Sequence, residues 1–251
     1  VLVEGFGFDV LVAFDDFQRI EKIGPLLASR PNIDRVEMWE FTAGKTHLPG
    51  AAGPDAKHET ILYGLPSDSE LFSPTLLAGR DLYPDDGHAI LLNQKLAKKM
   101  HLGVGDQVDI DLARAADTRW TIVGLILDPS GSGEGGNTAY VPRDVLSVDL
   151  RQYGRVSAVE IRGKVDTVQA QQAIAKDVRD FLEARGIGVN TTLSVLEFEQ
   201  QLGAAFSVVT AVLLVMTILM AVVGSIGLSG TLAINVIERK REIGVMRAVG
   251  A

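Results

Sequence analysis

The stretch FSVVTAVLLVMTILMAVVGSIGLSGTLAINVI, residues 206–237, decides the organisation of this 251-residue chain. It contains no charged residue over 32 positions, and a helix of about 20 apolar residues is enough to cross the hydrocarbon core of a bilayer. A buried core helix of a soluble protein is the alternative, but such helices usually have only about 10 to 14 apolar residues in a row. We therefore predict one transmembrane helix over residues 206–237.

Charge returns directly after this stretch, in ERKREIGVMRAVGA at residues 238–251. Its four basic and two acidic residues give a net charge of +2. Because the whole chain has a net charge of −8, the first 237 residues have a net charge of −10. Basic flanks of membrane spans stay in the cytoplasm. We expect residues 1–205 outside the cytoplasm, residues 238–251 inside it, and the protein in the cell (inner) membrane. The acidic outer part argues against a nucleic-acid partner.

The region before the span repeats one arrangement, strand, helix, strand. FGFDVLVAF (6–14) and RVEMWEF (35–41) alternate as strands do, and the acidic pair Asp15 and Asp16 between them suits a helix N-terminus. The second unit is VSAVEIRG (156–163), a helix over 167–186, and IGVNTTLSV (187–195). The residues of this helix expected to point inward are Val168, Ile174, Val178 and Phe181. The two units predict an α+β extracytoplasmic domain, residues 1–193, with a ferredoxin-like layer.

Residues 75–142 have a different sequence pattern, typical of short strands and turns. This pattern predicts a β-rich insertion between the two units. The glycine-rich loop at 129–137 lacks the lysine of a phosphate-binding loop. Asp106, Asp109 and Asp111 follow strand alternation, so we expect Asp109 and Asp111 on a solvated face. The histidines are far apart in sequence, and cysteine is absent, which excludes thiolate metal sites and disulfides. We predict no catalytic residue, cofactor or metal.

A single long helix is expected from Val195 to beyond Ile237, because Ser194 and Glu197 form a capping-box pattern and no proline follows. Its residues 194–205 would form a stalk above the membrane. Small residues recur within the span at spacings that let another helix approach closely. We predict a helix-packing interface; its residues are Ala221, Gly224, Ser225, Gly227, Ser229, Gly230 and Ala233.

The tail places Ile243, Met246 and Val249 on one helical face and its charged residues on the remainder. A helix at the cytoplasmic surface has this pattern, as does the start of a sensor linker. ERKREIGVMRAVGA resembles the E-R-x-R-E-I-G-x-x-R-A-x-G-A signature of ABC transporter permeases of the FtsX/MacB/LolC type. LLAGRDLYPDDGHAILLNQKLAKKMHLGVGDQVDI (76–110) is similar to part of that family's periplasmic core domain.

The resemblance implies a permease subunit with no chemistry of its own, in which a separate or fused ABC ATPase docks on the cytoplasmic segment. The implied docking residues are Glu238, Arg239, Arg241, Glu242, Ile243, Gly244, Met246, Arg247 and Gly250. Other implied partners are a second permease subunit, membrane lipid and an extracytoplasmic protein. ATP hydrolysis would move the outer domain for export, lipoprotein release or signalling. Members of the family have more spans than this chain, so we expect a longer polypeptide.

Two alternatives stay open on the residues alone. A single-span membrane sensor or anchored binding module would explain the same span and outer domain, and it requires a signalling segment after Ala251. An anchored hydrolase would require a catalytic constellation, and neither a G-x-S-x-G motif nor a histidine pair at ligand spacing is present.

Overall fold

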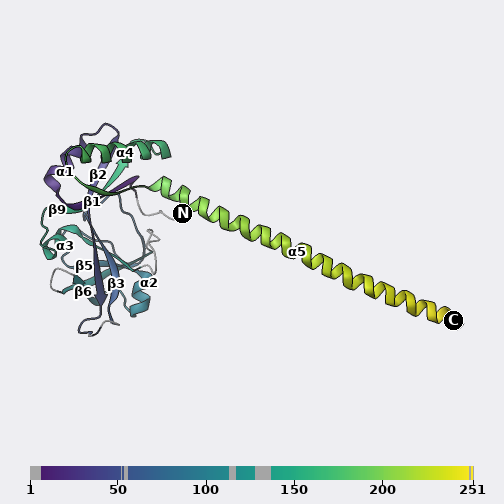
Figure 1. Ribbon diagram of the computed structural model, residues 1–251. Helices are drawn as coiled ribbons and strands as arrows, with labels where there is room; N and C mark the ends of the chain where they lie inside the picture. The colour runs from purple at the N-terminus through teal and green to yellow at the C-terminus, as the bar shows by residue number, and fades with distance from the viewer. Residues whose placement is uncertain are drawn as a thin grey trace. The chain divides into compact units, whose positions relative to one another are not determined.

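The computed structural model describes residues 7–51, 53, 56–112, 117–127, 137–248 and 250. The chain divides into two compact units, Val1–Glu199 and Gln200–Ala251. The first is a mixed α+β domain that holds every described strand, and the second consists of most of one long helix (Figure 1).

The two strand-helix-strand units form one layer of the outer domain. The first comprises β1 (Val10–Arg19), α1 (Ile20–Ala28) and β2 (Ile33–His47), and the second β9 (Arg155–Gly163), α4 (Val168–Glu183) and β10 (Val189–Ser194). Their strands lie in the order β10-β1-β9-β2, and every neighbouring pair is antiparallel. This is the strand order of a ferredoxin-like sheet, which confirms the predicted α+β class.

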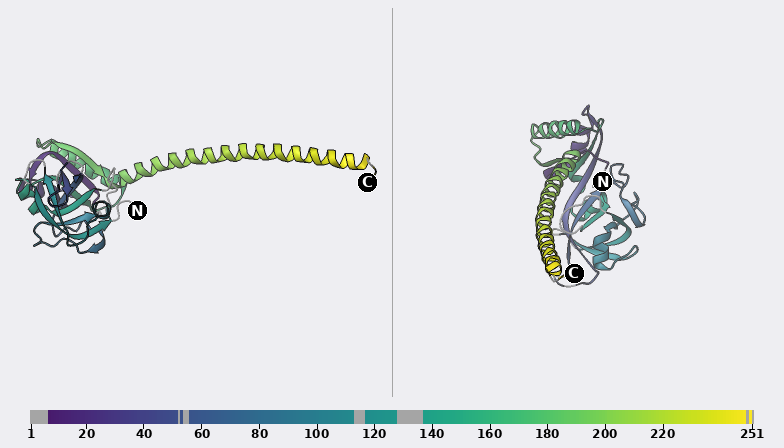
Figure 2. Two further views of the ribbon diagram at one scale, coloured as in Figure 1. Left: turned by 90° about the horizontal axis from the view of Figure 1, so that it is seen from below. Right: turned by 90° about the vertical axis from the view of Figure 1, so that its right-hand side faces the viewer.

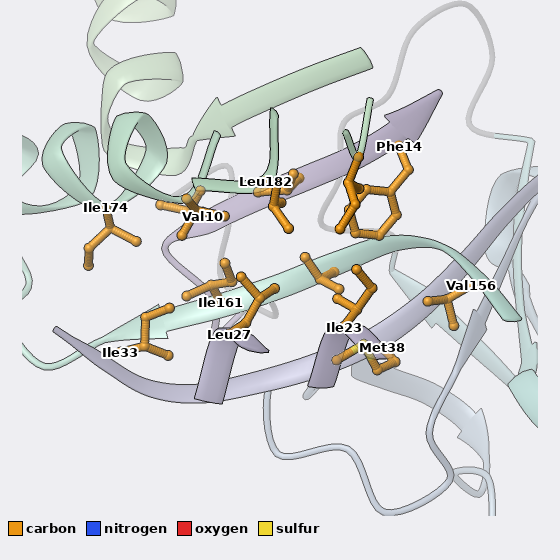
Figure 3. Close-up of a cluster of buried hydrophobic side chains, with 14 residues drawn as sticks. Val10, Phe14, Ile23, Leu27, Ile33, Met38, Val156, Ile161, Ile174 and Leu182 are labelled. Atoms are coloured by element: carbon orange, nitrogen blue, oxygen red, sulfur yellow. The ribbon is translucent and has the colours of Figure 1, made fainter. Parts of the chain in front are cut away.

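Helices α1 and α4 cover one face of this sheet. Ile23 and Leu27 of α1 and Val178 of α4 are fully buried among apolar side chains of β1, β9 and β2 (Figure 3). Burying one such side chain contributes about 1.5 to 3 kcal/mol. Alternation in the strands and helical spacing in α1 and α4 therefore produce a single core between the helices and the sheet.

Two details of this layer differ from the sequence prediction. Asp15 and Asp16 lie inside β1 and not at a helix N-terminus, because β1 continues to Arg19, which pairs with Arg155 beyond an irregularity in the register. In α4 the buried residues are Gln171, Ile174, Val178 and Leu182. Val168, which was expected to point inward, is only half-buried. Phe181 is half-buried as well, but it packs against the core of the layer as expected.

The inserted strands close into a barrel. They are β3 (His58–Leu65), β5 (Ala89–Asn93), β6 (Gln107–Leu112), β7 (Thr118–Leu127) and β8 (Thr138–Pro142), with β4 (Thr75–Gly79) added outside β7 and the helices α2 (Gln94–Met100) and α3 (Arg143–Asp149). The pairings run β2-β3-β8-β5-β7-β6 and return to β2. Leu62, Ile110 and Trp120 are fully buried in its core. Strand β3 was not predicted.

Strand β2 belongs to both the layer and the barrel. Its residues up to Trp39 pair with β9, and its residues from Glu40 onward pair with β3. Where β2 also meets β6, a side chain at Gly44 would place its Cβ 2.8 Å from Leu62 Cδ1 and 3.1 Å from the Asp111 carbonyl oxygen. The barrel therefore closes on a backbone position that leaves no space for a Cβ atom.

The long helix α5 runs from Val195 to Ala248 without a break, as predicted (Figure 2). Its 54 residues span about 80 Å at about 1.5 Å per residue. Val209–Ile226 has a mean hydropathy of 2.6 and is long and apolar enough to cross a membrane. None of this window is buried, and an exposed apolar surface of this length suits contact with lipid or with other apolar helices.

Candidate functional site

The predicted docking residues occupy the last turns of α5. Residues 238–248 are helical, and Gly250 follows in a turn with a positive φ of 92°. The side chain of Glu238 lies outside the described part of the chain. Ile243 and Met246 are 55% and 57% exposed, so this segment presents apolar side chains between charged ones. An exposed surface of this composition suits a protein contact.

Two arginines of the signature, Arg241 and Arg247, lie on different faces of the helix. Arg241 and Arg247 are six residues apart, which places them about 120° apart around the axis. Arg241 lines one side together with Glu242, Val245 and Met246. The segment could therefore contact a partner over more than one face, with one arginine contributing to each.

The predicted helix-packing residues all lie within α5, and they do not form a straight stripe. Steps of four residues advance about 40° around an α-helix, so the row from Ala221 to Ala233 winds by about 120°. A side chain at Gly224 or Gly230 would meet nothing within 4 Å. Gly227 and Ser229 are helical, and the side chain of Ser229 lies outside the described part of the structure. Winding rows of small residues suit a helix partner that crosses at an angle.

Three hydroxyl groups in the described part of the span are bonded within the helix. Thr210 donates to the Phe206 carbonyl at 2.9 Å, Thr217 to Leu213 at 2.8 Å and Ser225 to Ala221 at 2.7 Å. An unpaired hydroxyl in hydrocarbon costs several kcal/mol. These bonds make the segment compatible with lipid despite its polar residues.

A hydrogen-bonded joint holds the first turn of α5 inside the outer domain. The Val195 N–H donates to the Asp9 carbonyl at 2.9 Å, the Leu196 N–H to Gln171 Oε1 at 3.0 Å, and the Glu197 N–H to Ser194 Oγ at 3.4 Å. The N-cap role predicted for Ser194 is confirmed by the last of these bonds.

The joint extends into the ferredoxin-like layer through Asp9. One carboxylate oxygen of Asp9 accepts from the Gly163 N–H at 2.6 Å, and the other accepts from Gln171 Nε2 at 2.9 Å. Burial, more than any other cause, raises the pKa of Asp9. Sequence reasoning missed Asp9 and Gln171. The available signal was a glutamine at a position of α4 that continues the buried row of Ile174, Val178 and Leu182.

Buried carboxyl groups gather where β2 passes from the layer to the barrel. Glu37 accepts hydrogen bonds from the N–H groups of Glu70 at 2.8 Å and Leu71 at 3.2 Å. Its partner across the strands is Glu160, whose pKa is raised well above its usual value by burial and by the Glu37 charge. Both causes disfavour the charged form of Glu160.

Glu40 is fully buried at the start of the barrel portion of β2. Neither of its carboxylate oxygens has a hydrogen-bond partner among the described residues. Burial raises its pKa to about 7, and the charge of Arg143 acts in the opposite direction. A charged Glu40 is therefore costly, and it lies on the strand that joins the two parts of the domain.

The acidic strand residues of the barrel are structural. Asp109 was expected to face water, but its side chain is largely buried, because Arg119 across the β6-β7 ladder binds it at 2.8 and 3.1 Å. Asp111 pairs with Lys57 at 2.5 Å. Within the described ranges, no group of three or more histidine, aspartate or glutamate side chains is placed to hold a metal ion.

Residues 9–177 match the family described as MacB-like periplasmic core domain. The chain is 24% identical over 209 residues to an uncharacterized ABC transporter permease of Methanocaldococcus jannaschii, and the match covers 78% of this chain. The chain spans about half the length of that relative, 49%.

Two solved structures share the fold. The periplasmic region of MacB from Actinobacillus actinomycetemcomitans matches with a TM-score of 0.54 and 14% identity over 80% of this chain and 95% of that one. The extracellular domain of the noncanonic ABC-type transporter YknZ from Gram-positive bacteria matches with a TM-score of 0.50 and 14% identity over 73% and 99%. The family model matches more than half of the chain, and we conclude that this protein belongs to the family with a MacB-like periplasmic core domain.

Proposed function

We propose that the chain is part of a membrane permease subunit that couples ATP hydrolysis by a partner ABC ATPase to movement of the extracytoplasmic domain. That movement would serve export, lipoprotein release or signalling. In this proposal residues 1–205 lie outside the cytoplasm, with 194–205 as a stalk, 206–237 cross the cell membrane and 238–251 contact the ATPase. The ATPase supplies the hydrolysis, whether fused or separate.

One observation carries the proposal. Helix α5 is unbroken from its hydrogen-bonded first turn in the outer domain to the exposed charged segment at 238–248. A continuous helix transmits an axial or tilting displacement, because each turn is tied to the next by backbone hydrogen bonds. The family membership favours a permease over the single-span sensor or anchored binding module, which would use the same span only as an anchor.

The other partners in this proposal follow from the span. The winding row of small residues on α5 would pack against a helix of the same permease or of a second permease subunit, in a homodimer or heterodimer. Membrane lipid would surround the remaining apolar face. The outer domain, with no catalytic group assigned to it, would bind cargo or an extracytoplasmic protein.

Charge reversal at the docking segment tests this function. The full-length protein should co-purify with an ABC ATPase, and Arg241→Glu with Arg247→Glu should abolish that association. Lys240→Glu makes the same charge change as one of these reversals, directly beside Arg241 and at a position where the signature accepts any residue, and should leave the association intact. Normal ATPase recovery with the double reversal would refute the docking role.

A further inference from the structure

Gln171 has an unusual position for a polar residue. It is 1% exposed, and it precedes Ile174, Val178 and Leu182 on the buried face of α4. An apolar side chain would continue that face, and a buried amide costs free energy unless its hydrogen bonds are made. The fold tolerates a glutamine here only because its partners surround it.

Every hydrogen-bonding position of the Gln171 amide is used. Nε2 donates to Asp9 Oδ1 at 2.9 Å and to Asp166 Oδ1 at 3.2 Å, and Oε1 accepts from Ser194 Oγ and the Leu196 N–H, both at 3.0 Å. A side-chain amide has two donor hydrogens and two acceptor lone pairs. These partners fix which end of the Gln171 amide is Nε2 and which is Oε1, because a carboxylate only accepts hydrogen bonds and a backbone N–H only donates them.

These bonds join four segments at the origin of α5. Asp9 immediately precedes β1, Asp166 precedes α4, Ser194 ends β10, and Leu196 lies in the first turn of α5. The first N–H groups of a helix have no partner within the helix, and helix ends fray when these groups are unbonded. Here Val195, Leu196 and Glu197 all donate to residues of the outer domain or its edge.

We propose that Gln171 is the residue that transmits displacement of α5 into the outer domain, by clamping the first turn of the helix to α4 and to the start of β1. This role rests on the proposed function of the chain. A displacement of the helix reaches the domain through the clamped turn, whereas an unclamped turn unwinds and absorbs it.

The chain offers matched variants for a test. Gln171→Met keeps an unbranched side chain of similar size and removes all four hydrogen bonds. Gln172 is exposed on the same helix, so Gln172→Met is the control. Gln171→Glu is the variant that separates transmission from simple destabilisation. Its carboxylate repels Asp9 and Asp166 at high pH, and its protonated form donates to one of them and still accepts from Leu196.

Two measurements on the full-length protein with its co-purified ATPase, in lipid nanodiscs, give the result. The first is amide hydrogen exchange at Leu196 and Glu197, which should accelerate about tenfold in Gln171→Met, because the Leu196 N–H loses its acceptor and the first turn of α5 frays more readily. The second is ATP-dependent energy transfer from a donor dye at Tyr153→Cys to acceptor-labelled lipid. Residues 1–251 contain no cysteine, and any cysteine in the rest of the full-length protein or in the ATPase is replaced by alanine, so that this label is unique.

We expect Gln171→Met to lose the ATP-dependent change and Gln172→Met to keep it. Gln171→Glu should show the change at pH 5.5 and lose it at pH 8, relative to the unsubstituted protein at each pH. An unaltered change in Gln171→Met, or the same response of Gln171→Glu at both pH values, would overturn the proposal. No ATP-dependent change in the unsubstituted protein would instead overturn the proposed function itself, and with it this role of Gln171.

Discussion

Replacing Glu40 by glutamine should stabilise the outer domain at high pH and leave it unchanged at low pH. The folded protein raises the pKa of this buried carboxyl from 4.5 to about 7. Below pH 4.5 the group is protonated in the folded and unfolded states alike. As the pH rises, the unfolded state releases its proton first, so the stability of the native protein falls until the pH passes about 7.

The size of the effect follows from that difference in pKa. Each pKa unit corresponds to about 1.4 kcal/mol, so the ionised carboxylate costs about 3 kcal/mol at pH 8. Glu40→Gln removes this cost and keeps the shape of the side chain. For a domain of this size the gain corresponds to a rise in melting temperature of about 6 to 12 °C. At pH 4.5 the two proteins should melt within about 2 °C of each other.

Thermal melts of the full chain in detergent, at pH 4.5 and pH 8, provide the assay. Trp39 and Trp120, the two tryptophans of the chain, are fully buried in the outer domain, so their fluorescence reports its unfolding. Glu160 also has a raised pKa, and the difference between variant and native protein isolates Glu40. Glu59→Gln, at an exposed position of β3, is the control. Equal stability of Glu40→Gln and the native protein at pH 8 would refute the reasoning.

Three further predictions concern closure, topology and packing. Gly44→Ala should destabilise the outer domain by about 1 to 3 kcal/mol, because its Cβ would lie 2.8 Å from Leu62 Cδ1. The control Gly87→Ala, whose Cβ would have nothing within 4 Å, should change stability by less than about 0.5 kcal/mol. Equal melting curves of the two variants would contradict the barrel closure. A membrane-impermeant maleimide should label Tyr153→Cys on intact cells and Val245→Cys only after permeabilisation, both positions being exposed; the reverse pattern would invert the proposed orientation. Gly224→Leu should lower helix cross-linking within the full-length permease, while Val223→Leu should not, and unchanged cross-linking in both would argue against the packing interface.

The local parts of the fold were predictable because their signals are local. Alternation in β1, β2 and β9 and helical spacing in α1 and α4 each arise from neighbours within one element. The unbroken helix α5 followed from a capping serine and the absence of proline after it. The prediction for Asp15 and Asp16 was wrong because the pairing of Arg19 with Arg155 extends β1, and that partner is far away in sequence.

The barrel and the joint depend on contacts between distant segments. Strand β2 looks like one ordinary strand, and its division between β9 and the pair β3 and β6 is visible only when all of these strands are placed. The four-way bonding of Gln171 joins residues up to 162 positions apart. Only the interruption of an apolar row by one glutamine marked that site in the sequence.

The central claim is that ATP hydrolysis moves the outer domain through α5, and its most direct test is energy transfer from a donor at Tyr153→Cys to acceptor-labelled lipid. The measurement uses the full-length protein with its ATPase in nanodiscs, with and without Mg²⁺ and ATP. We predict a reversible change on adding ATP that disappears when Arg241→Glu and Arg247→Glu are introduced together. An unchanged signal under turnover, with the ATPase bound and active, would contradict the account.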